Sequence, residues 1–313
     1  MNESIKAIKQ EVEKVVIGKE RVIEQALTAI IAGGHILLED KPGVGKTTLA
    51  LAFSKAMGLE FNRVQFTPDV VPTDITGFSM YNKQTGSFEY VKGAAMCNFL
   101  LADEINRTSS KTQAALLEVM QEGKMTVDGE SHKVPEPFIV MATQNPIGTA
   151  GTQMLPEAQL DRFMIQLSMG YPDTEAQKAI LRDRKRVDPM TKIEEVLTDS
   201  ELVIMQRAAK EIYVDEKILT YITELVEKTR EHKFVKLGVS PRGALAIMAM
   251  AQAAAYVNGM EYVIPQFVAE NFEALCRHRL ILDGKAQLSN ITKEEILREI
   301  LDSTKAPVLE SNK

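Results

Sequence analysis

The sequence predicts an α/β domain with a mainly parallel sheet, followed by a smaller domain made of helices. Between about residues 17 and 170, short apolar runs alternate with amphipathic stretches and polar breaks, which is typical of strands and helices that alternate along a chain. After Tyr171-Pro172-Asp173 the strand-like runs stop and long helical windows follow. A chain of 313 residues also exceeds what one core usually fills. We therefore expect two domains, at residues 1–172 and 173–313.

Five short apolar runs in the first part are the candidate strands of the sheet, at residues 36–38, 61–66, 99–102, 138–142 and 164–167. Two further segments alternate in polarity around turn residues and predict β-hairpins inserted between the strands, at residues 78–91 and 125–134. Ser110, with Gln113 three residues later, indicates a capping box, and Gly123 should end the helix that follows. In the second part, the expected helices lie near residues 174–186, 198–211, 215–232, 242–257, 265–280 and 293–302.

The composition is that of an ordinary globular protein with a slightly acidic surface. Lys and Arg number 37 against 43 Asp and Glu, for a net charge of −6, and 45% of the residues are hydrophobic, which excludes disordered classes. The most apolar window, residues 244–257, is shorter than the roughly 18 residues of a membrane span. Residues 1–16 lack the apolar stretch of a secretion signal, and Cys97 and Cys276 show no metal-site spacing. We expect a cytoplasmic protein with both thiols buried.

A glycine-containing loop, residues 40–48, follows the first candidate strand and precedes a helical run. Glycines allow successive backbone N–H groups to turn around phosphate oxygens at the positive end of the next helix. Lys46 would place its charge on the terminal phosphates, and the Thr47 hydroxyl would join the ligands of a magnesium ion. A Gly-Pro turn that precedes a lysine by chance is the structural alternative. The expected phosphate-binding residues are Pro42, Gly43, Val44, Gly45, Lys46, Thr47 and Thr48.

Asp40 departs from the general phosphate-loop pattern GxxxxGK[ST], which asks for glycine at that position. Asp tolerates a left-handed backbone better than most residues and can also hydrogen-bond its own turn. We therefore expect the loop to form with Asp40 in place.

Polar side chains end two of the candidate strands. Asp103 and Glu104 follow the run at residues 99–102. Two adjacent acids at the end of a strand can serve different roles, one in holding a metal ion and the other in activating water. Asp103 would hold magnesium through water, while Glu104 would polarise the water that attacks the γ-phosphate. Asn145 follows the next strand and would orient that water. Solvated loop acids and an ordinary Asn-Pro turn are the alternatives when each segment is considered alone.

Several stretches resemble the MoxR family of AAA+ ATPases. Gly34 to Asp40 reads GHILLED, Leu101 to Arg107 reads LADEINR, Ala142 to Pro146 reads ATQNP, and Leu155 to Phe163 reads LPEAQLDRF. The motifs occur in the family's order and the likeness covers most of the chain. The resemblance implies an AAA+ P-loop domain with a five-stranded parallel sheet and a helix-2 β-hairpin insert, followed by an all-helical lid. It also implies ATP and Mg²⁺ as cofactors and assembly into a ring, commonly a hexamer, with the nucleotide between subunits.

The resemblance also implies roles for residues outside the phosphate loop. Arg162 is expected to reach the γ-phosphate of the neighbouring subunit, with an intrachain ion pair to Asp161 or Glu157 as the alternative. Arg242, in Ser240-Pro241-Arg242, is expected to contact its own subunit's nucleotide, and Ile17 and Gly18 are expected near the adenine. The hairpin at residues 78–91 corresponds to the family's insert, and cross-strand packing is the preferred explanation of its aromatic residues Tyr81, Phe88 and Tyr90.

Three functions follow from these motifs. The first is an ATP-hydrolysing chaperone that remodels or activates client proteins, with a von Willebrand factor A domain protein as partner. The second is a nucleic-acid-dependent motor of the helix-2-insert group, against which the negative net charge counts. The third is a nucleotide-gated scaffold with little turnover, which the intact Lys46, Asp103 and Glu104 disfavour.

Overall fold

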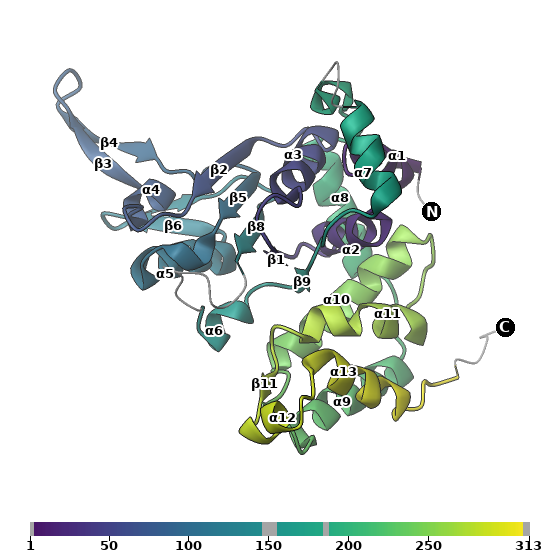
Figure 1. Cartoon of the computed structure of the whole chain (residues 1–313). Coiled ribbons are helices and arrows are strands. Elements are labelled where there is room, and N and C mark those ends of the chain that lie inside the picture. The colour runs from purple at the N-terminus through teal and green to yellow at the C-terminus, as the bar shows by residue number, and fades with distance from the viewer. Residues whose placement is uncertain (1–2, 146–154, 184–187, 309–313) are drawn as a thin grey trace.

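The computed structural model describes residues 3–145, 155–183 and 188–308. They form a five-stranded sheet with helices on both faces, two β-hairpins, and a helical lid (Figure 1). All neighbouring strands of the sheet run parallel, in the order β2-β5-β8-β1-β9. The strands of this sheet are β1 (Ile36–Glu39), β2 (Phe61–Gln65), β5 (Phe99–Asp103), β8 (Ile139–Gln144) and β9 (Ile165–Leu167). The five runs expected from the sequence are therefore the five sheet strands.

Alternating side chains of the sheet supply two cores, as the two-residue period of a strand requires. Ile36 and Leu38 face one core, while Leu37 between them faces the other. The first core continues without interruption into the lid, and the second lies under α4 and α5. Helices of the first part are α1 (Glu3–Glu13), α2 (Glu20–Ile31), α3 (Lys46–Ala56), α4 (Pro72–Thr76), α5 (Ser110–Glu122) and α6 (Glu157–Leu160), with a 3₁₀ turn at Ile105–Arg107.

Both hairpins expected from the sequence are present. β3 (Gly77–Asn82) pairs antiparallel with β4 (Ser87–Lys92), and this hairpin projects from the α/β domain on the side away from the lid (Figure 1). β6 (Lys124–Val127) pairs with β7 (Glu130–Lys133) across Asp128-Gly129, where both residues have positive φ. The ring of Tyr90 on β4 stacks on His132 of β7, with ring centroids 3.8 Å apart. The two hairpins therefore contact each other.

The start of α5 differs by one residue from the prediction. Ser109, not Ser110, is the N-cap, and its hydroxyl accepts a hydrogen bond from the Thr112 N–H at 3.3 Å. Gln113 does not close a capping box, because its side-chain amide is buried and donates to the Ile105 carbonyl at 3.0 Å. Sequence spacing alone does not show which of the two successive serines, Ser109 or Ser110, caps the helix. Gly123 ends the helix in the left-handed conformation, as expected.

The lid is helical, with one short pair of strands that the sequence analysis did not predict. β10 (Val235–Leu237) pairs antiparallel with β11 (Ile281–Leu282), and both strands are too short to show a periodic pattern. Residues 184–186 of the helix expected at 174–186 lie outside the described residues. The helices that follow residue 172 are α7 (Thr174–Asp183), α8 (Asp199–Lys210), α9 (Glu216–Glu231), α10 (Pro241–Val257), α11 (Pro265–Cys276), α12 (Gly284–Leu288) and α13 (Lys293–Asp302), with a 3₁₀ turn at Pro189–Lys192.

Cys97 and Cys276 are buried, as expected, and burial raises the pKa of each thiol to about 12. Within the described ranges, none of the helices combines the length and apolarity that crossing a bilayer requires.

Candidate active site

The phosphate loop joins the end of β1 to the first turn of α3, as the sequence predicts. Gly43 and Gly45 have φ values of 82° and 99°, which glycine adopts without strain. A Cβ atom on Gly43 would project into space with no atom within 4 Å, so the loop leaves its concave side clear. The unpaired N–H groups and dipole of the α3 N-terminus favour an anion at this place. The local geometry fits a nucleotide's phosphates.

Asp40 supports the loop through its side chain. Its carboxylate accepts hydrogen bonds from the Lys41 N–H at 2.9 Å, the Gly170 N–H at 2.7 Å and the Ser168 hydroxyl at 3.0 Å. The hydrogen bond from Asp40 to its own turn was expected. The left-handed backbone was not found, because Asp40 is not among the non-glycine residues with positive φ. Tolerance of that conformation is therefore not the reason that an aspartate fits here. Burial raises the pKa of this carboxyl, but the hydrogen bonds outweigh burial and the pKa is lowered. Asp40 therefore ties the loop to the segment that follows β9.

Lys46 is buried at the first position of α3, and its ammonium group donates to the Asp40 carbonyl at 2.7 Å. Burial lowers the pKa of Lys46, and the nearby Asp40 and Asp103 carboxylates oppose this shift. A cavity of about 410 Å³ opens beside the ammonium group. It brings the loop and both strand-end motifs together, and its lining residues are Pro42, Gly43, Gly45, Lys46, Thr47, Thr48, Arg63, Gln65, Asp103, Glu104 and Asn145.

Thr143 joins the two acids of this cavity. Its hydroxyl donates to the Asp103 carboxylate at 2.6 Å and accepts a hydrogen bond from the Glu104 N–H at 2.8 Å. The other carboxylate oxygen of Asp103 pairs with the Arg63 guanidinium at 2.7 Å. The register places Asp103 beside Gln65, the last residue of β2. Gln65, Asp103 and Thr143 lie at or next to the carboxyl ends of parallel strands, so they meet at one edge of the sheet, and Arg63 reaches this edge from the middle of β2.

Glu104 sits in the left-handed region with φ 57°, which is uncommon for a residue with a Cβ atom. Its carboxylate accepts hydrogen bonds from Gln65 Nε2 at 2.8 Å, Arg107 at 2.8 Å and Asn145 Nδ2 at 3.1 Å. Burial raises its pKa, but the bonds from Arg107 and Asn145 outweigh burial and the pKa is lowered. Glu104 is therefore held ionised and within reach of Asn145.

Asn145 is held in turn by Asn106. The Asn106 side chain donates to the Asn145 carbonyl at 3.2 Å and accepts from the Asn145 N–H at 3.4 Å. This reciprocal pair fixes the end of β8 against the 3₁₀ turn that follows the two acids. Asn145 is thus more than a simple turn residue, because both its backbone and its side chain contact the acidic strand end.

A second cavity, of about 260 Å³, adjoins the first and shares Gly43, Gly45 and Thr48 with it. Its other lining residues are mostly apolar, as a heterocyclic base requires, and they are Val15, Val16, Ile17, Lys19, Val44, Met169, Tyr171, Pro172, Gln177 and Ile180. Ile17 lines this cavity, and its expected place near the adenine stays a prediction. Gly18 does not line it; a Cβ atom there would lie 2.9 Å from Ala176 Cβ, so this glycine lets α7 pack closely.

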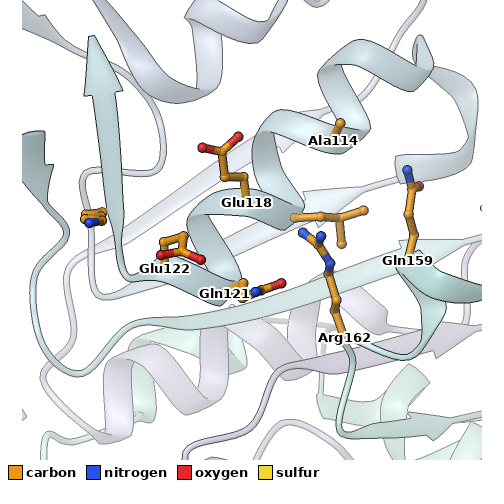
Figure 2. Close-up of a pocket in the computed structure, with 8 residues that line it drawn as sticks. Ala114, Glu118, Gln121, Glu122, Gln159 and Arg162 are labelled. Carbon is orange, nitrogen blue, oxygen red and sulfur yellow. The ribbon is translucent and has the colours of Figure 1, made fainter. Parts of the chain in front are cut away.

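Arg162 lies in a different cavity, of about 430 Å³, between α6 and α5. Figure 2 shows its side chain extending toward α5, which carries Glu118. Within the described part of the chain, Arg162 Nε is buried without a hydrogen-bond partner. The intrachain ion pair of Arg162 with Asp161, considered above as the alternative to a role at the neighbour's nucleotide, does not form. Asp161 pairs instead with Arg279 at 2.7 Å. Arg162 is not among the residues that line its own chain's phosphate cavity.

Residues 35–165 match the family described as "ATPase family associated with various cellular activities (AAA)", and residues 227–300 match the AAA lid domain. The chain is 39% identical to the chaperone MoxR1 of Mycobacterium tuberculosis, over 95% of this chain and 81% of that protein. It belongs to the MoxR family of AAA+ ATPases.

Other relatives agree with this assignment. The MoxR-family chain is 46% identical to the protein YeaC of Bacillus subtilis, over 96% of this chain and 94% of that protein. A crystal structure from Cytophaga hutchinsonii matches it with a TM-score of 0.90 and 35% identity, covering 98% of this chain and 96% of the other. A minichromosome maintenance homologue from Methanopyrus kandleri, at 17% identity and a TM-score of 0.59, shares the fold.

Arg242 of this MoxR-family ATPase is exposed at the start of α10 and is not among the residues that line its phosphate cavity. The N-cap of that helix, Ser240, donates to the Asp161 carboxylate at 2.7 Å. Arg242 therefore lies near the segment that carries Arg162. Its expected contact with its own subunit's nucleotide stays a prediction.

Sequence reasoning missed Arg63, Gln65 and Thr143 in the site of this MoxR-family ATPase. For Gln65 and Thr143 the available signal was a position at the polar end of a predicted strand, whereas Arg63 lies in the middle of one. Using that signal required knowing that β2 and β8 flank β5, and the strand order comes only from the fold.

Proposed function

We propose that this protein binds ATP with Mg²⁺ and hydrolyses it to ADP and phosphate. The observation that carries this proposal is Glu104, an ionised carboxylate held by Gln65 and Asn145 in the same cavity as the phosphate loop. In the proposed reaction, Glu104 accepts a proton from the attacking water and Asn145 orients that water. Lys46 and the loop N–H groups stabilise charge on the phosphate oxygens.

The donor set at the strand end suits magnesium. Thr47 and Asp103 would hold it, since hydroxyl and carboxylate oxygens are the ligands that Mg²⁺ prefers. An ion held there would supply positive charge against the negative charge that develops on the phosphate oxygens. Thr143 keeps Asp103 in place, because its hydroxyl donates to one carboxylate oxygen of that acid at 2.6 Å.

A ring in which each nucleotide lies between two subunits would complete the site. Arg162 supports this proposal, because its guanidinium faces a cavity remote from its own phosphate loop and its Nε lacks a partner among the described residues. A hexamer is the form that the family resemblance implies. In such a ring Arg162 would supply the cation that phosphoryl transfer needs from the neighbour.

We infer a chaperone role from the relative named MoxR1, which is a chaperone. The protein would use ATP to remodel or activate client proteins, with a von Willebrand factor A domain protein as partner. The cytoplasmic location expected from the sequence stays a prediction.

Glu104→Gln tests both parts of this proposal. The variant should bind ATP with unchanged affinity and lose about 100-fold or more in kcat, since it removes a general base. Glu60→Gln, at an exposed acid outside the site, is the matched control and should hydrolyse ATP normally. Wild-type phosphate release by Glu104→Gln would contradict the hydrolytic role.

The same variant, tagged and held in ATP, should retain client proteins on an affinity column. Mass spectrometry of the eluate, compared with that of Lys46→Ala, identifies what is retained only in the ATP state. DNA or RNA in place of protein would contradict the chaperone role and favour a nucleic-acid motor.

A further inference from the structure

Arg279 lies just beyond the end of α11, inside the contact between the lid and the segment that carries Arg162. We call this segment, residues 161–164, the Arg162 segment. The side chain of Arg279 is 2% exposed, which is rare for a charged group without strong partners. Burial lowers its pKa, and the Asp161 carboxylate opposes this shift.

The guanidinium of Arg279 binds both flanks of Arg162. Its Nε donates to the Asp161 carboxylate at 2.7 Å, Nη2 to the Phe163 carbonyl at 2.7 Å, and Nη1 to the Met164 carbonyl at 3.0 Å. The neighbouring His278 also hydrogen-bonds the Phe163 carbonyl through Nε2, at 3.0 Å. Arg279 also donates to its own helix, at the Leu275 carbonyl. One planar side chain therefore holds the backbone on each side of Arg162.

The start of α10 completes this anchor. Asp161 uses its second carboxylate oxygen to accept a hydrogen bond from Ser240, the N-cap of α10, at 2.7 Å. Gly243, in the first turn of that helix, makes room for the guanidinium, since a Cβ atom there would lie 2.8 Å from Arg279 Cδ and 3.0 Å from Nε. Two lid helices, α10 and α11, thus converge on the Arg162 segment.

Within the described ranges, the backbone around Arg162 is held by hydrogen bonds, whereas its side-chain Nε is not. The backbone on both flanks is fixed by Arg279, whereas the side chain extends into the 430 Å³ cavity and its Nε has no partner in the described structure (Figure 2). The direction of the guanidinium therefore depends on how the lid holds the segment. A catalytic cation that is misplaced by about 1 Å can cost about 100-fold in rate.

We propose that Arg279 is a positioning residue that sets Arg162 for the neighbouring subunit's nucleotide and makes the lid part of that subunit's hydrolytic site. This inference rests on the proposed function, because it assumes that Arg162 acts across a subunit contact. Arg279 itself does not line the phosphate cavity or the Arg162 cavity. A lysine cannot replace it fully, because an ammonium group lacks the planar fork that reaches Asp161 and two carbonyls at once.

The test combines single variants with mixed rings. Arg279→Met alone should keep its affinity for ATP and lose about 100-fold in kcat. Mixed with Lys46→Ala subunits, which cannot bind nucleotide but carry an intact Arg162, it should regain activity. Mixed with Arg162→Ala subunits it should not, because both partners then lack a correctly placed Arg162.

Arg277→Met is the matched control. Arg277 lies two residues earlier at the same end of α11, and its contacts are with Gln166 and Glu294 and not with the Arg162 segment. Its kcat should stay within about twofold of wild type, since loss of a partly exposed contact has a small effect.

Two results would overturn the proposal. If Arg279→Met regains activity with Arg162→Ala and not with Lys46→Ala, Arg279 serves its own subunit's site. If it regains activity with neither, while Arg162→Ala and Lys46→Ala restore each other, its role is structural only. If even that reference pair fails, the shared site of the proposed function is wrong, and the positioning role falls with it.

Arg279→Lys keeps the test decisive if Arg279→Met does not fold. It preserves a charge opposite Asp161 and should show the same pattern in mixtures, with a smaller loss of about 10-fold in kcat. Normal turnover by Arg279→Lys, together with an unfolded Arg279→Met, would assign Arg279 to stability alone and would also overturn the proposal.

Discussion

The phosphate cavity and the Arg162 cavity lie in the same domain but differ in how their polar groups are partnered. In the phosphate cavity, Asp103, Glu104 and Asn145 each have hydrogen-bond partners within the chain. In the other cavity, Arg162 Nε is buried and lacks one among the described residues. Buried polar groups are nearly always paired, so the exception needs an explanation.

The difference indicates which parts of the site are complete in one subunit. The acids and the amide are preorganised by Thr143, Gln65 and Asn106, which is the arrangement that electrostatic catalysis requires before the substrate arrives. The backbone around Arg162 is held in place, whereas its side-chain Nε has no hydrogen-bond partner among the described residues. This arrangement suits a group that acts on another molecule. The predictions below test one cavity against the other.

Removing Lys46 should have the largest effect, because it takes the central cation out of the phosphate cavity. Lys46→Ala should bind ATP about 1000-fold more weakly, since truncating one partner of a buried charge pair costs about 4 kcal/mol. Isothermal titration calorimetry measures this directly, with the melting temperature as the control for folding. Tight ATP binding by the variant would show that the loop does not hold the phosphates.

Removing Arg162 should lower kcat and leave the affinity for ATP intact, which is the opposite outcome to the loss of Lys46. Arg162→Ala should lower kcat by about 1000-fold, the usual worth of an arginine finger. Arg107→Ala, at an arginine that pairs with Glu104 in the same chain, is the comparison variant. Activity regained by mixing Arg162→Ala with Lys46→Ala supports the shared site, and no recovery would contradict a role for Arg162 at the neighbouring subunit's nucleotide.

His35 should make the stability of the α/β domain depend on pH. Its Nδ1 accepts the Val140 N–H at 3.0 Å and its Nε2 donates to the Met120 carbonyl at 3.0 Å, so the folded state holds the neutral ring. Burial lowers its pKa from 6.5 to about 4. Between these values the unfolded chain binds the extra proton, so stability is present above pH 6.5 and declines as the pH falls toward 4.

The expected loss is about 2 kcal/mol, less than the full shift implies, because His35 is only partly buried by exposed area. Urea unfolding between pH 4 and 7 measures it, and His35→Gln should lack this slope. An equal slope in both proteins would assign the pH dependence to other groups.

Asp40→Gly should have the smallest effect, although it restores the general loop pattern. The change leaves the Gly170 N–H without its carboxylate partner and loosens the loop. It should weaken ATP binding about 5-fold, or about 1 kcal/mol, the low end of the cost of a lost buried hydrogen bond. Asp128→Gly, in an exposed hairpin turn with positive φ, is the control and should bind ATP normally. Unchanged affinity in Asp40→Gly would show that the loop holds its shape without this support.

The sequence predicted the parts of the site that lie next to one another in the chain. The loop from Pro42 to Thr48 and the Asp103-Glu104 pair are short motifs on elements with clear periodicity, and the structure places both in one cavity except for Val44, which lines the adjoining one. It did not predict Arg63, Gln65 or Thr143, because their proximity depends on the order of strands in the sheet. Arg279 was missed for the same reason, since it lies 118 residues from Asp161 in the chain.

The sequence by itself determined that this protein has an α/β phosphate-loop domain and a helical lid, because strand and helix periods and glycine conformations are local properties. Only the tertiary structure decided which side chains pair with the two acids, that Asp40 supports the loop through its carboxylate, and that the lid anchors the segment of Arg162. Those contacts join residues far apart in the chain, and their energies exist only once the sheet and lid are assembled.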